Sequence, residues 1–217
     1  MTDQVIVTGM VIFTAPVNDY DRRIIILTKE RGKITVFAKG ARRQGSRMLA
    51  ATNPFCFGNF KLYEGKTAYN LIEANISNYF EELRSDFSGA YLGMYFLEFA
   101  DYYSRENNDE VELLKLLYQT IRAVIKESID NRLIKVVYEM KIMVINGEFP
   151  GIPKDRPTSK AAAYTIDFIT RTPVEKLYTF KVSDEVLEEL SSISDMYRNK
   201  YIDKHFKSLD LIGDFEL

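Results

Sequence analysis

The chain of 217 residues has one cysteine, one histidine and no tryptophan. A single cysteine, Cys56, forms no disulfide within the chain, and with His205 it supplies too few ligands for a tetrahedral zinc site. Catalytic designs that need several imidazoles are excluded for the same reason. Cys56 lies in an apolar segment, which predicts a buried thiol that packs as a small hydrophobic group. Because this cysteine usage suits a reducing compartment, we expect a cytoplasmic protein.

Long apolar runs and catalytic motifs are also missing. No segment approaches the roughly 20 apolar residues of a membrane span, and the residues before the first apolar run contain no Lys or Arg, so we expect no secretory signal. The motifs GxxxxGKS/T, GxGxxG, HExxH and GxSxG do not occur. The carboxylates, as in SDEVLEEL, spread along the outer faces of expected helices, which favours a solvated surface. The sequence therefore predicts a protein that is not an enzyme and has no cofactor and no bound metal.

Positive charge is scarce overall but concentrated in one place. The chain has 29 Lys and Arg against 31 Asp and Glu. Residues 29–47 nevertheless contain seven basic residues and one acid, Glu30. This window carries a net charge of +6, so the rest of the chain carries −8. Concentrated positive charge points to an acidic partner rather than to solubility.

The first 80 residues have the composition of β-strands. Apolar and β-branched runs predict five strands, at residues 5–13, 23–29, 33–39, 54–64 and 68–77. Gly9 indicates a bulge or bend in the first strand, and Gly32 suits a tight hairpin between the second and third. Five short strands in about 80 residues predict a closed barrel of the OB type, although the count alone also fits an SH3-like barrel.

From about residue 77 the pattern changes to that of helices. The sequence predicts helices at residues 85–103, 111–125, 131–145, 159–170 and 183–206. The first is apolar almost all round, as a buried central helix would be. The second is opened by Asp109 and has an apolar face made of Val111, Leu114, Tyr118, Ile121 and Ile125. We predict an α+β fold, with an OB-fold nucleic-acid-binding domain at residues 1–78 and an all-helical domain at residues 79–217.

The loop KGARRQGSR, residues 39–47, is the candidate binding site. Its cations are Lys39, Arg42, Arg43 and Arg47, and its two glycines allow the backbone to bend closely. Each phosphate that such cations neutralise releases counterions, so the loop could dominate the affinity for nucleic acid. OB barrels bind strands across one face and its loops. The alternative is a solvated loop without a partner.

Aromatic side chains near this loop are candidates for base stacking. The set is Phe37, Phe55, Phe57, Phe60 and Tyr63. An exposed ring could stack on a base. Strand alternation leads us to expect three or four of the five in the barrel core instead.

With these elements in place, the sequence resembles the RecO family of bacterial DNA repair mediators. The resemblance is carried by DYDRRIIILTKERGKITVFAKGARR, SRM and PF in the first 65 residues, and more weakly by YFEEL, VINGEFPGIP and KSLDLI. It implies an OB fold with a helical domain, and a non-enzymatic mediator that binds single- and double-stranded DNA and anneals complementary strands. It also implies a cytoplasmic, nucleoid-associated protein. Its partners would be RecR, in loading RecA, and the acidic tail of single-stranded DNA-binding protein.

The resemblance also implies site residues. The DNA-contacting set is Lys39, Arg42, Arg43 and Arg47, with Arg31 and Lys33 as further candidates. Many RecO proteins have a four-cysteine zinc module after the third helix. Here that stretch reads EFPGIPKDRPTSKAAAYTIDFITRTP and has no cysteine, so we expect a short helix in its place and no zinc.

For the acidic tail we expect a site on the third helix. Arg132 or Lys135 would meet the terminal carboxylate. Lys141 adds a further cation, and the apolar neighbours would be Val136, Met140 and Ile142. The competing hypothesis makes these apolar residues core. Two other hypotheses also stay open: an interaction adaptor whose barrel no longer binds nucleic acid, and a nuclease, which would need clustered metal-binding carboxylates that the sequence does not offer.

Overall fold

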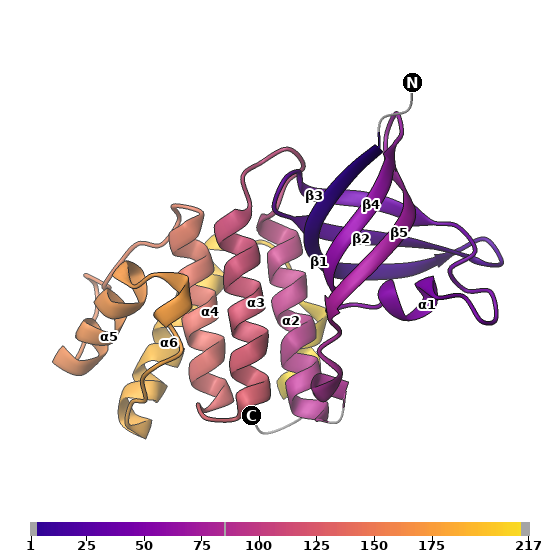
Figure 1. The fold of residues 1–217 in the computed structure, drawn as a ribbon. Coiled ribbons are helices and arrows are strands. Elements are labelled where there is room, and N and C mark those ends of the chain that lie inside the picture. The colour runs from indigo at the N-terminus through magenta and orange to yellow at the C-terminus, as the bar shows by residue number, and fades with distance from the viewer. Residues whose placement is uncertain (1–3, 85, 214–217) are drawn as a thin grey trace. The chain divides into compact units, whose positions relative to one another are not determined.

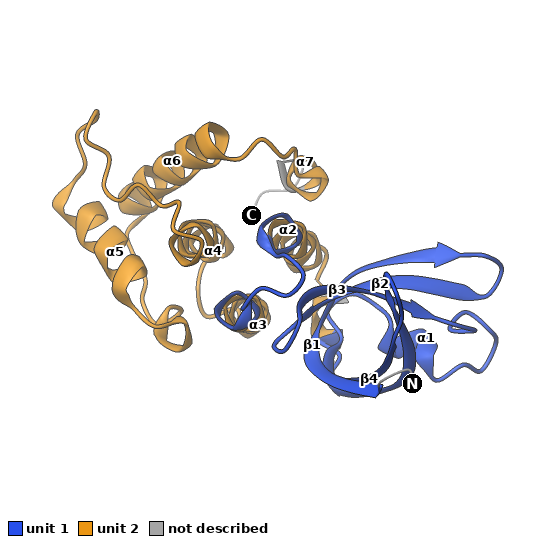
Figure 2. Cartoon of the chain, turned by 90° about the horizontal axis from the view of Figure 1, so that it is seen from above, with its two compact units in different colours: residues 1–81, 100–114 blue, residues 82–99, 115–217 orange. Residues whose placement is uncertain are grey.

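The computed structural model describes residues 4–84 and 86–213. By its internal contacts the chain divides into two compact units, Met1–Glu81 with Ala100–Leu114, and Glu82–Phe99 with Lys115–Leu217 (Figure 2). The sequence did not anticipate that the segment 100–114 groups with the strands. The division into domains at residues 78 and 79 stays a prediction.

The first unit is built on a closed five-stranded barrel, which Figure 2 shows as a ring. The strands are β1 (Gln4–Val17), β2 (Asp21–Thr28), β3 (Gly32–Ala38), β4 (Phe57–Glu64) and β5 (Tyr69–Asn78), in the order β1-β2-β3-β5-β4. The β3–β5 pair is parallel and the other pairs are antiparallel. Inward positions alternate along each strand, and Val7, Ile26, Val36 and Phe60 are buried in the centre. The predicted α+β fold, with a five-stranded barrel before a helical region, is confirmed.

The first strand differs from its prediction in length and in the place of its irregularity. It extends to Val17 rather than residue 13, leaving a turn of residues 18–20. The register shifts between Val11 and Phe13, so the bulge is not at Gly9. Gly9 is in the ladder, where an added Cβ would lie 2.3 Å from the Leu27 carbonyl oxygen, so the glycine is required by close strand approach. The fourth strand begins at Phe57, three residues later than predicted.

The β2–β3 turn is fixed by the segment 100–114. Gly32 has φ +62°, as the predicted hairpin requires, and a Cβ there would lie 2.2 Å from the Arg105 carbonyl oxygen. The Lys33 amide donates to that same oxygen at 2.9 Å, and the Asn107 amide donates to the Arg31 carbonyl oxygen at 2.9 Å. These backbone bonds explain why the segment groups with the barrel.

The second unit is helical (Figure 1). The helices of the chain after the barrel are α2 (Phe87–Tyr103), α3 (Val111–Lys126), α4 (Asn131–Ile145), α5 (Lys160–Arg171), α6 (Asp184–Tyr201) and α7 (Lys207–Gly213), with 3-10 turns at Glu81–Arg84 and Val174–Lys176. The end of α2, from Ala100 on, and the start of α3, up to Leu114, belong to the first unit. The predicted α4 is confirmed at both ends. Ser85, where the sequence predicts the start of α2, lies outside the described residues. The last predicted helix is wrong in length, because it ends at Tyr201 and α7 follows separately.

The core of the helical unit is aromatic. Tyr95, Phe96 and Phe99 of α2 are fully buried, as predicted for a central helix. The ring of Phe96 lies 4.5 Å from that of Tyr138 on α4, and the Tyr138 hydroxyl donates to the Phe96 carbonyl oxygen at 2.9 Å. The predicted face of α3 is offset from the buried one. Leu114 and Ile121 are buried as expected, but Val111, Tyr118 and Ile125 are only half-buried. The other buried residues of α3 are Leu113, Leu116, Leu117, Thr120, Ala123 and Val124.

A buried carboxylate connects α2, α4 and α6. Glu139 is fully buried; its Oε1 accepts from the Tyr95 hydroxyl and lies 2.8 Å from Arg198 Nη1 and 3.1 Å from Lys135 Nζ. Its Oε2 accepts from Ser194 Oγ at 2.6 Å. Burial by itself would raise the pKa of Glu139, but the two cations and two hydroxyl donors outweigh it and hold the pKa below its ordinary value.

Candidate nucleic-acid interface

The loop after β3 is exposed at all four predicted cations. Lys39, Arg42, Arg43 and Arg47 are each solvent-exposed, and Arg47 precedes the short helix α1 (Met48–Ala51). The two glycines of the loop, at φ +66° and +77°, have the left-handed backbone that lets it fold back. The structure thus gathers these four residues in one loop.

The β1–β2 turn holds this loop in shape. The Arg42 amide donates to the Tyr20 carbonyl oxygen at 2.8 Å, and Arg42 Nη1 donates to the Asn18 carbonyl oxygen at 3.3 Å. The Gly40 amide donates to Asp21 Oδ1 at 2.7 Å. The two segments therefore lie side by side (Figure 1). Asp21 thus organises the loop through a backbone amide, and among the described residues it forms no ion pair with the loop cations.

A further arginine, Arg22, anchors the other end of the loop. Its Nη1 donates to Leu49 O at 2.8 Å, and to Thr52 Oγ1 and Asn53 Oδ1 at 2.9 Å each. Burial lowers the pKa of Arg22, and the neighbouring Arg42 cation lowers it further. The charges of Arg22 and Arg42 are therefore close enough to repel each other.

Two exposed aromatic rings of the first unit each have an arginine over the ring, and one of these arginines, Arg43, belongs to the basic loop. The Arg23 guanidinium lies 5.4 Å from the centre of the Phe13 ring, and that of Arg43 lies 5.5 Å from the Tyr20 ring. Phe13 is 40% exposed and Tyr20 is 54% exposed. An exposed ring with a cation beside it is the combination that single strands use, since the base stacks and the phosphate pairs.

The sequence prediction for the aromatic residues was wrong in detail. Phe55 and Phe60 are buried, but Phe37 and Phe57 are half-buried and Tyr63 is exposed, so two of the five are core rather than three or four. The prediction also missed Phe13, Tyr20, Arg22 and Arg23. The signal that could have found the last three is YDRR, residues 20–23, an aromatic residue in the turn followed by two arginines at the start of β2.

Arg31 and Lys33 lie at the other end of β3 from the loop cations. Lys33 Nζ donates to the Asp101 carbonyl oxygen at 2.6 Å and to Asp101 Oδ1 at 3.1 Å. Arg31 Nη2 lies 3.6 Å from Glu64 Oε2. Both positive charges are therefore paired within the chain, and the structure does not bring them into the loop cluster.

The cations predicted for the acidic tail are paired as well. Arg132 Nη2 lies 2.8 Å from Asp130 Oδ2 and 3.5 Å from Asp184 Oδ1. Lys135 Nζ contacts Glu139 as described above and lies 3.4 Å from Asp195 Oδ1, with its side chain 12% exposed.

The side chains beside these cations are interior. Val136, Met140 and Ile142 are buried, which confirms the competing hypothesis that they are core. Lys141 Nζ is buried too and donates to three carbonyl oxygens near the end of α5, those of Ile169, Thr170 and Thr172. Lys141 is therefore a structural cap for α5.

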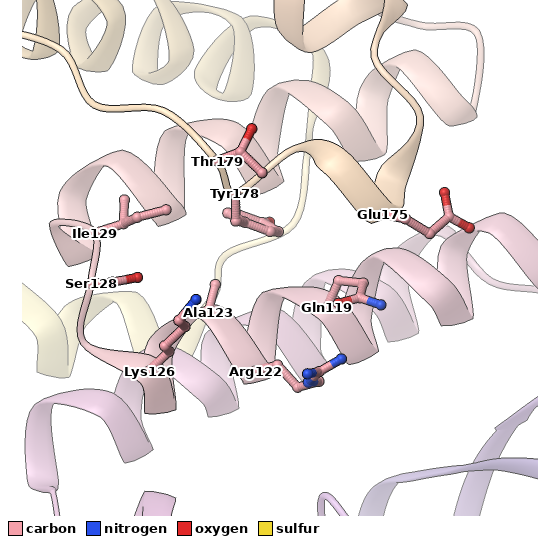
Figure 3. Close-up of a pocket in the computed structure, with 9 residues that line it drawn as sticks. All are labelled: Gln119, Arg122, Ala123, Lys126, Ser128, Ile129, Glu175, Tyr178 and Thr179. Carbon is pink, nitrogen blue, oxygen red and sulfur yellow. The ribbon is translucent and has the colours of Figure 1, made fainter.

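A pocket of about 260 Å³ opens between α3 and the segment after the Val174–Lys176 turn (Figure 3). Its lining is Gln119, Arg122, Ala123, Lys126, Ser128, Ile129, Glu175, Tyr178 and Thr179. Glu175 lies 3.7 Å from Lys115, and the Tyr178 hydroxyl is hydrogen-bonded to Thr120 Oγ1 at 2.6 Å. Burial raises the pKa of Tyr178, so the phenol stays protonated at neutral pH. The exposed cations Arg122 and Lys126 contact no acid in the described part of the chain.

Within residues 4–84 and 86–213, no His, Cys, Asp and Glu side chains form a group of three or more that could hold a metal ion. Cys56 is buried, as predicted. His205 is exposed between α6 and α7, with Nε2 2.8 Å from Asp210 Oδ2. No helix in these residues has the length and apolarity to cross a membrane.

Comparison with known proteins covers nearly the whole chain. Residues 1–80 match the family model described as Recombination protein O N terminal, and residues 84–153 and 152–210 match Recombination protein O C terminal. The DNA repair protein RecO of Acetivibrio thermocellus is 25% identical over 94% of this chain and 94% of the relative, and that of Clostridium acetobutylicum is 26% identical over 94% and 95%. The RecO of Alkaliphilus metalliredigens is 32% identical over 65% of this chain and 58% of the relative.

An OB-type barrel with a helical unit and an exposed basic loop defines a class of barrel proteins suited to nucleic acid. Two matching family models, which together span most of the sequence, identify the family within that class. The chain belongs to the RecO family of DNA repair and recombination proteins. Members are recombination mediators rather than enzymes, so the prediction that this chain is not an enzyme is confirmed by its family.

Proposed function

We propose that this chain binds single- and double-stranded DNA through the basic loop, residues 39–47, and anneals complementary strands. The observation that carries the proposal is the state of the four loop cations. They are exposed, they share one loop, and none of them contacts a carboxylate among the described residues. Their charge is thus available to phosphates, whereas Arg31 and Lys33 would first have to leave their acid partners.

Annealing follows from the type of contact that such a loop makes. Lysine and arginine contacts to phosphate fix a strand in place but carry no base information. A strand held by its backbone keeps its base edges free to pair with a complementary strand. Neutralising phosphates also reduces the repulsion between two strands as they approach. No bond is made or broken in this process, in keeping with a mediator that needs neither a catalytic group nor a cofactor.

The family supports a place in recombination for this activity. We propose that the protein acts with RecR to load RecA on DNA coated by single-stranded DNA-binding protein, as a cytoplasmic, nucleoid-associated protein. The rival hypothesis is an adaptor that no longer binds nucleic acid. It does not explain why four cations remain exposed and unneutralised in a loop braced by the β1–β2 turn and Arg22.

The acidic tail of single-stranded DNA-binding protein is the proposed partner of the helical unit. The site at Arg132 and Lys135 stays a prediction, and the tail would have to compete there with the existing acid partners of both cations. The pocket with Arg122 and Lys126 offers cations without acid partners, and it is a second candidate site for that reason. Both candidate sites rest on the attraction between their cations and the acidic tail.

The experiment that tests the proposal is strand annealing by the purified protein. Replacing two loop cations, Arg42→Ala with Arg43→Ala, should slow annealing by about tenfold or more, since each charge-assisted phosphate contact contributes on the order of 1 kcal/mol. The matched control, Lys154→Ala with Lys160→Ala, removes the same charge from exposed positions in the helical unit. If both variants slowed annealing equally, the effect would come from the lower net charge of the protein and not from the loop. A wild type that neither binds nor anneals DNA would favour the adaptor.

A further inference from the structure

The outer surface of the barrel has a hollow of about 470 Å³ next to the basic loop. It is lined by Lys39, Tyr63, Asn70, Leu71 and Ile72. The hollow exists because β3 and β5 pair only at Val36↔Tyr69 and Phe37↔Asn70. Where the strands stop pairing they leave a gap, and Lys39 follows β3 at that point. Its volume lies in the range of about 300–1,000 Å³ that is usual for small-ligand pockets.

The hollow combines a flat ring with two polar groups. Tyr63 is 40% exposed, and its hydroxyl accepts a hydrogen bond from Gln4 Nε2 at 3.1 Å, which restrains the ring. The side-chain amide of Asn70 and the ammonium group of Lys39 make no hydrogen bond or ion pair in the part of the chain that the structure describes. Asn70 is nevertheless half-buried, so its amide is partly removed from water without a protein partner.

A nucleobase satisfies each of these groups. Its face stacks on a tyrosine ring, and every base has such a face, so no particular sequence is required. An amide both donates and accepts hydrogen bonds and can pair with the polar edge of a base. A lysine at the rim is placed for the phosphate attached to that base. Lys39 also belongs to the basic loop, so the hollow continues the proposed backbone track.

We infer that this hollow takes one unpaired base of a single strand, stacked on Tyr63, hydrogen-bonded to Asn70 and with its phosphate at Lys39. The inference rests on the proposed function, because the same strand runs over the basic loop. It adds a preference that phosphate contacts alone do not provide. A base inside a duplex is stacked and paired, so it enters the hollow only after unpairing, which costs a few kcal/mol. The hollow therefore favours single strands over duplexes.

The test compares two variants at one position on two kinds of DNA. Tyr63→Ala removes the ring and should weaken binding of a single-stranded oligonucleotide by about 5- to 150-fold, the range for loss of one stacked base. Its affinity for a blunt duplex should change by less than about twofold, since phosphate contacts remain. Tyr63→Phe is the matched control. It keeps the ring and loses only the hydroxyl contact to Gln4, so it should bind single strands within about threefold of the wild type.

The outcomes separate this inference from the proposed function. Equal weakening of single-strand and duplex binding by Tyr63→Ala would overturn the inference, because the change would then act on the barrel as a whole. Unchanged single-strand binding would overturn it too. In either case duplex binding that depends on Arg42 and Arg43 would leave the proposed function intact. A wild type that binds neither form of DNA would remove the proposed function itself. Thermal unfolding of each variant verifies that it is folded.

Discussion

Replacing the buried carboxylate by an amide, Glu139→Gln, should destabilise the helical unit by about 3 kcal/mol at neutral pH. The amide keeps the shape of the side chain, and its oxygen can still face Tyr95, Lys135 and Arg198. The amide has no negative charge. Lys135 and Arg198, whose side chains are each 12% exposed, are then left with Asp195 as their remaining acid partner. Removing one partner of a buried ion pair costs about 3–5 kcal/mol. The lower end applies here because both cations retain Asp195 and reach some solvent.

The same substitution has a defined pH dependence. The pKa of Glu139 is lowered in the folded protein relative to the ordinary value of about 4.3. A group with a depressed folded pKa contributes stability that is fully present above the unfolded value and is lost as the pH falls through the folded value. The stability gap between wild type and Glu139→Gln should therefore be constant from about pH 7 to pH 5. It should narrow below about pH 4, where the wild type takes up the proton.

Urea unfolding followed by the helical circular dichroism signal measures this gap. The control is Asp167→Asn, which removes an exposed carboxylate 2.7 Å from Arg171 Nε and should cost no more than about 0.5 kcal/mol at any pH. If Glu139→Gln were as stable as the wild type at neutral pH, the predicted loss of about 3 kcal/mol would be refuted. A gap that persists undiminished at about pH 3 would refute the reasoning on the charge.

Three further predictions concern the barrel turn, metal and the partner tail. Gly32→Ala should lower the free energy of unfolding by about 2–4 kcal/mol, because its Cβ meets the Arg105 carbonyl oxygen. Gly45→Ala, also at positive φ but in open space, should lower it by only about 1–2 kcal/mol. Equal losses for the two variants in urea unfolding would contradict the close-approach argument. Elemental analysis should find no stoichiometric zinc, and a chelator should leave Tm unchanged; one tightly bound zinc per chain would overturn this. A fluorescent acidic tail peptide should bind Arg132→Glu with Lys135→Glu more weakly than wild type by about tenfold, and equal affinity would exclude that site. The same titration with both exposed pocket cations on α3 reversed tests the second candidate site.

The sequence predicted the elements that local pattern determines. Residues 131–145 form α4 as expected, because apolar spacing, the Asp130 side chain that caps the helix and the glycine after its end all agree. The barrel followed from strand count and from Gly32 in its hairpin. The loop cations are exposed, as is usual for a segment of nine polar or small residues. Their role in DNA binding stays a prediction.

Long-range geometry determined what the sequence missed. Phe13 follows Val7 and Val11 in an alternation that would put it inside the barrel, but the bulge between Val11 and Phe13 turns it outward. The partner of Lys33 is Asp101, a residue 68 positions away. Lys135 meets Asp195 across 60 positions. No local sequence pattern predicts such pairs, so the sequence did not show which cations are already neutralised within the fold.

The most direct test of the central claim is the salt dependence of DNA binding. Dissociation constants for a single strand and a duplex are measured from about 50 to 200 mM salt for wild type and for Arg42→Ala with Arg43→Ala. Losing two phosphate contacts should reduce the slope of log affinity against log salt by about 1.4 on the single strand and about 1.8 on the duplex, whatever the DNA sequence. The Lys154→Ala with Lys160→Ala control should keep the wild-type slope. An unchanged slope and affinity in the Arg42 and Arg43 variant would put the DNA site elsewhere on the molecule.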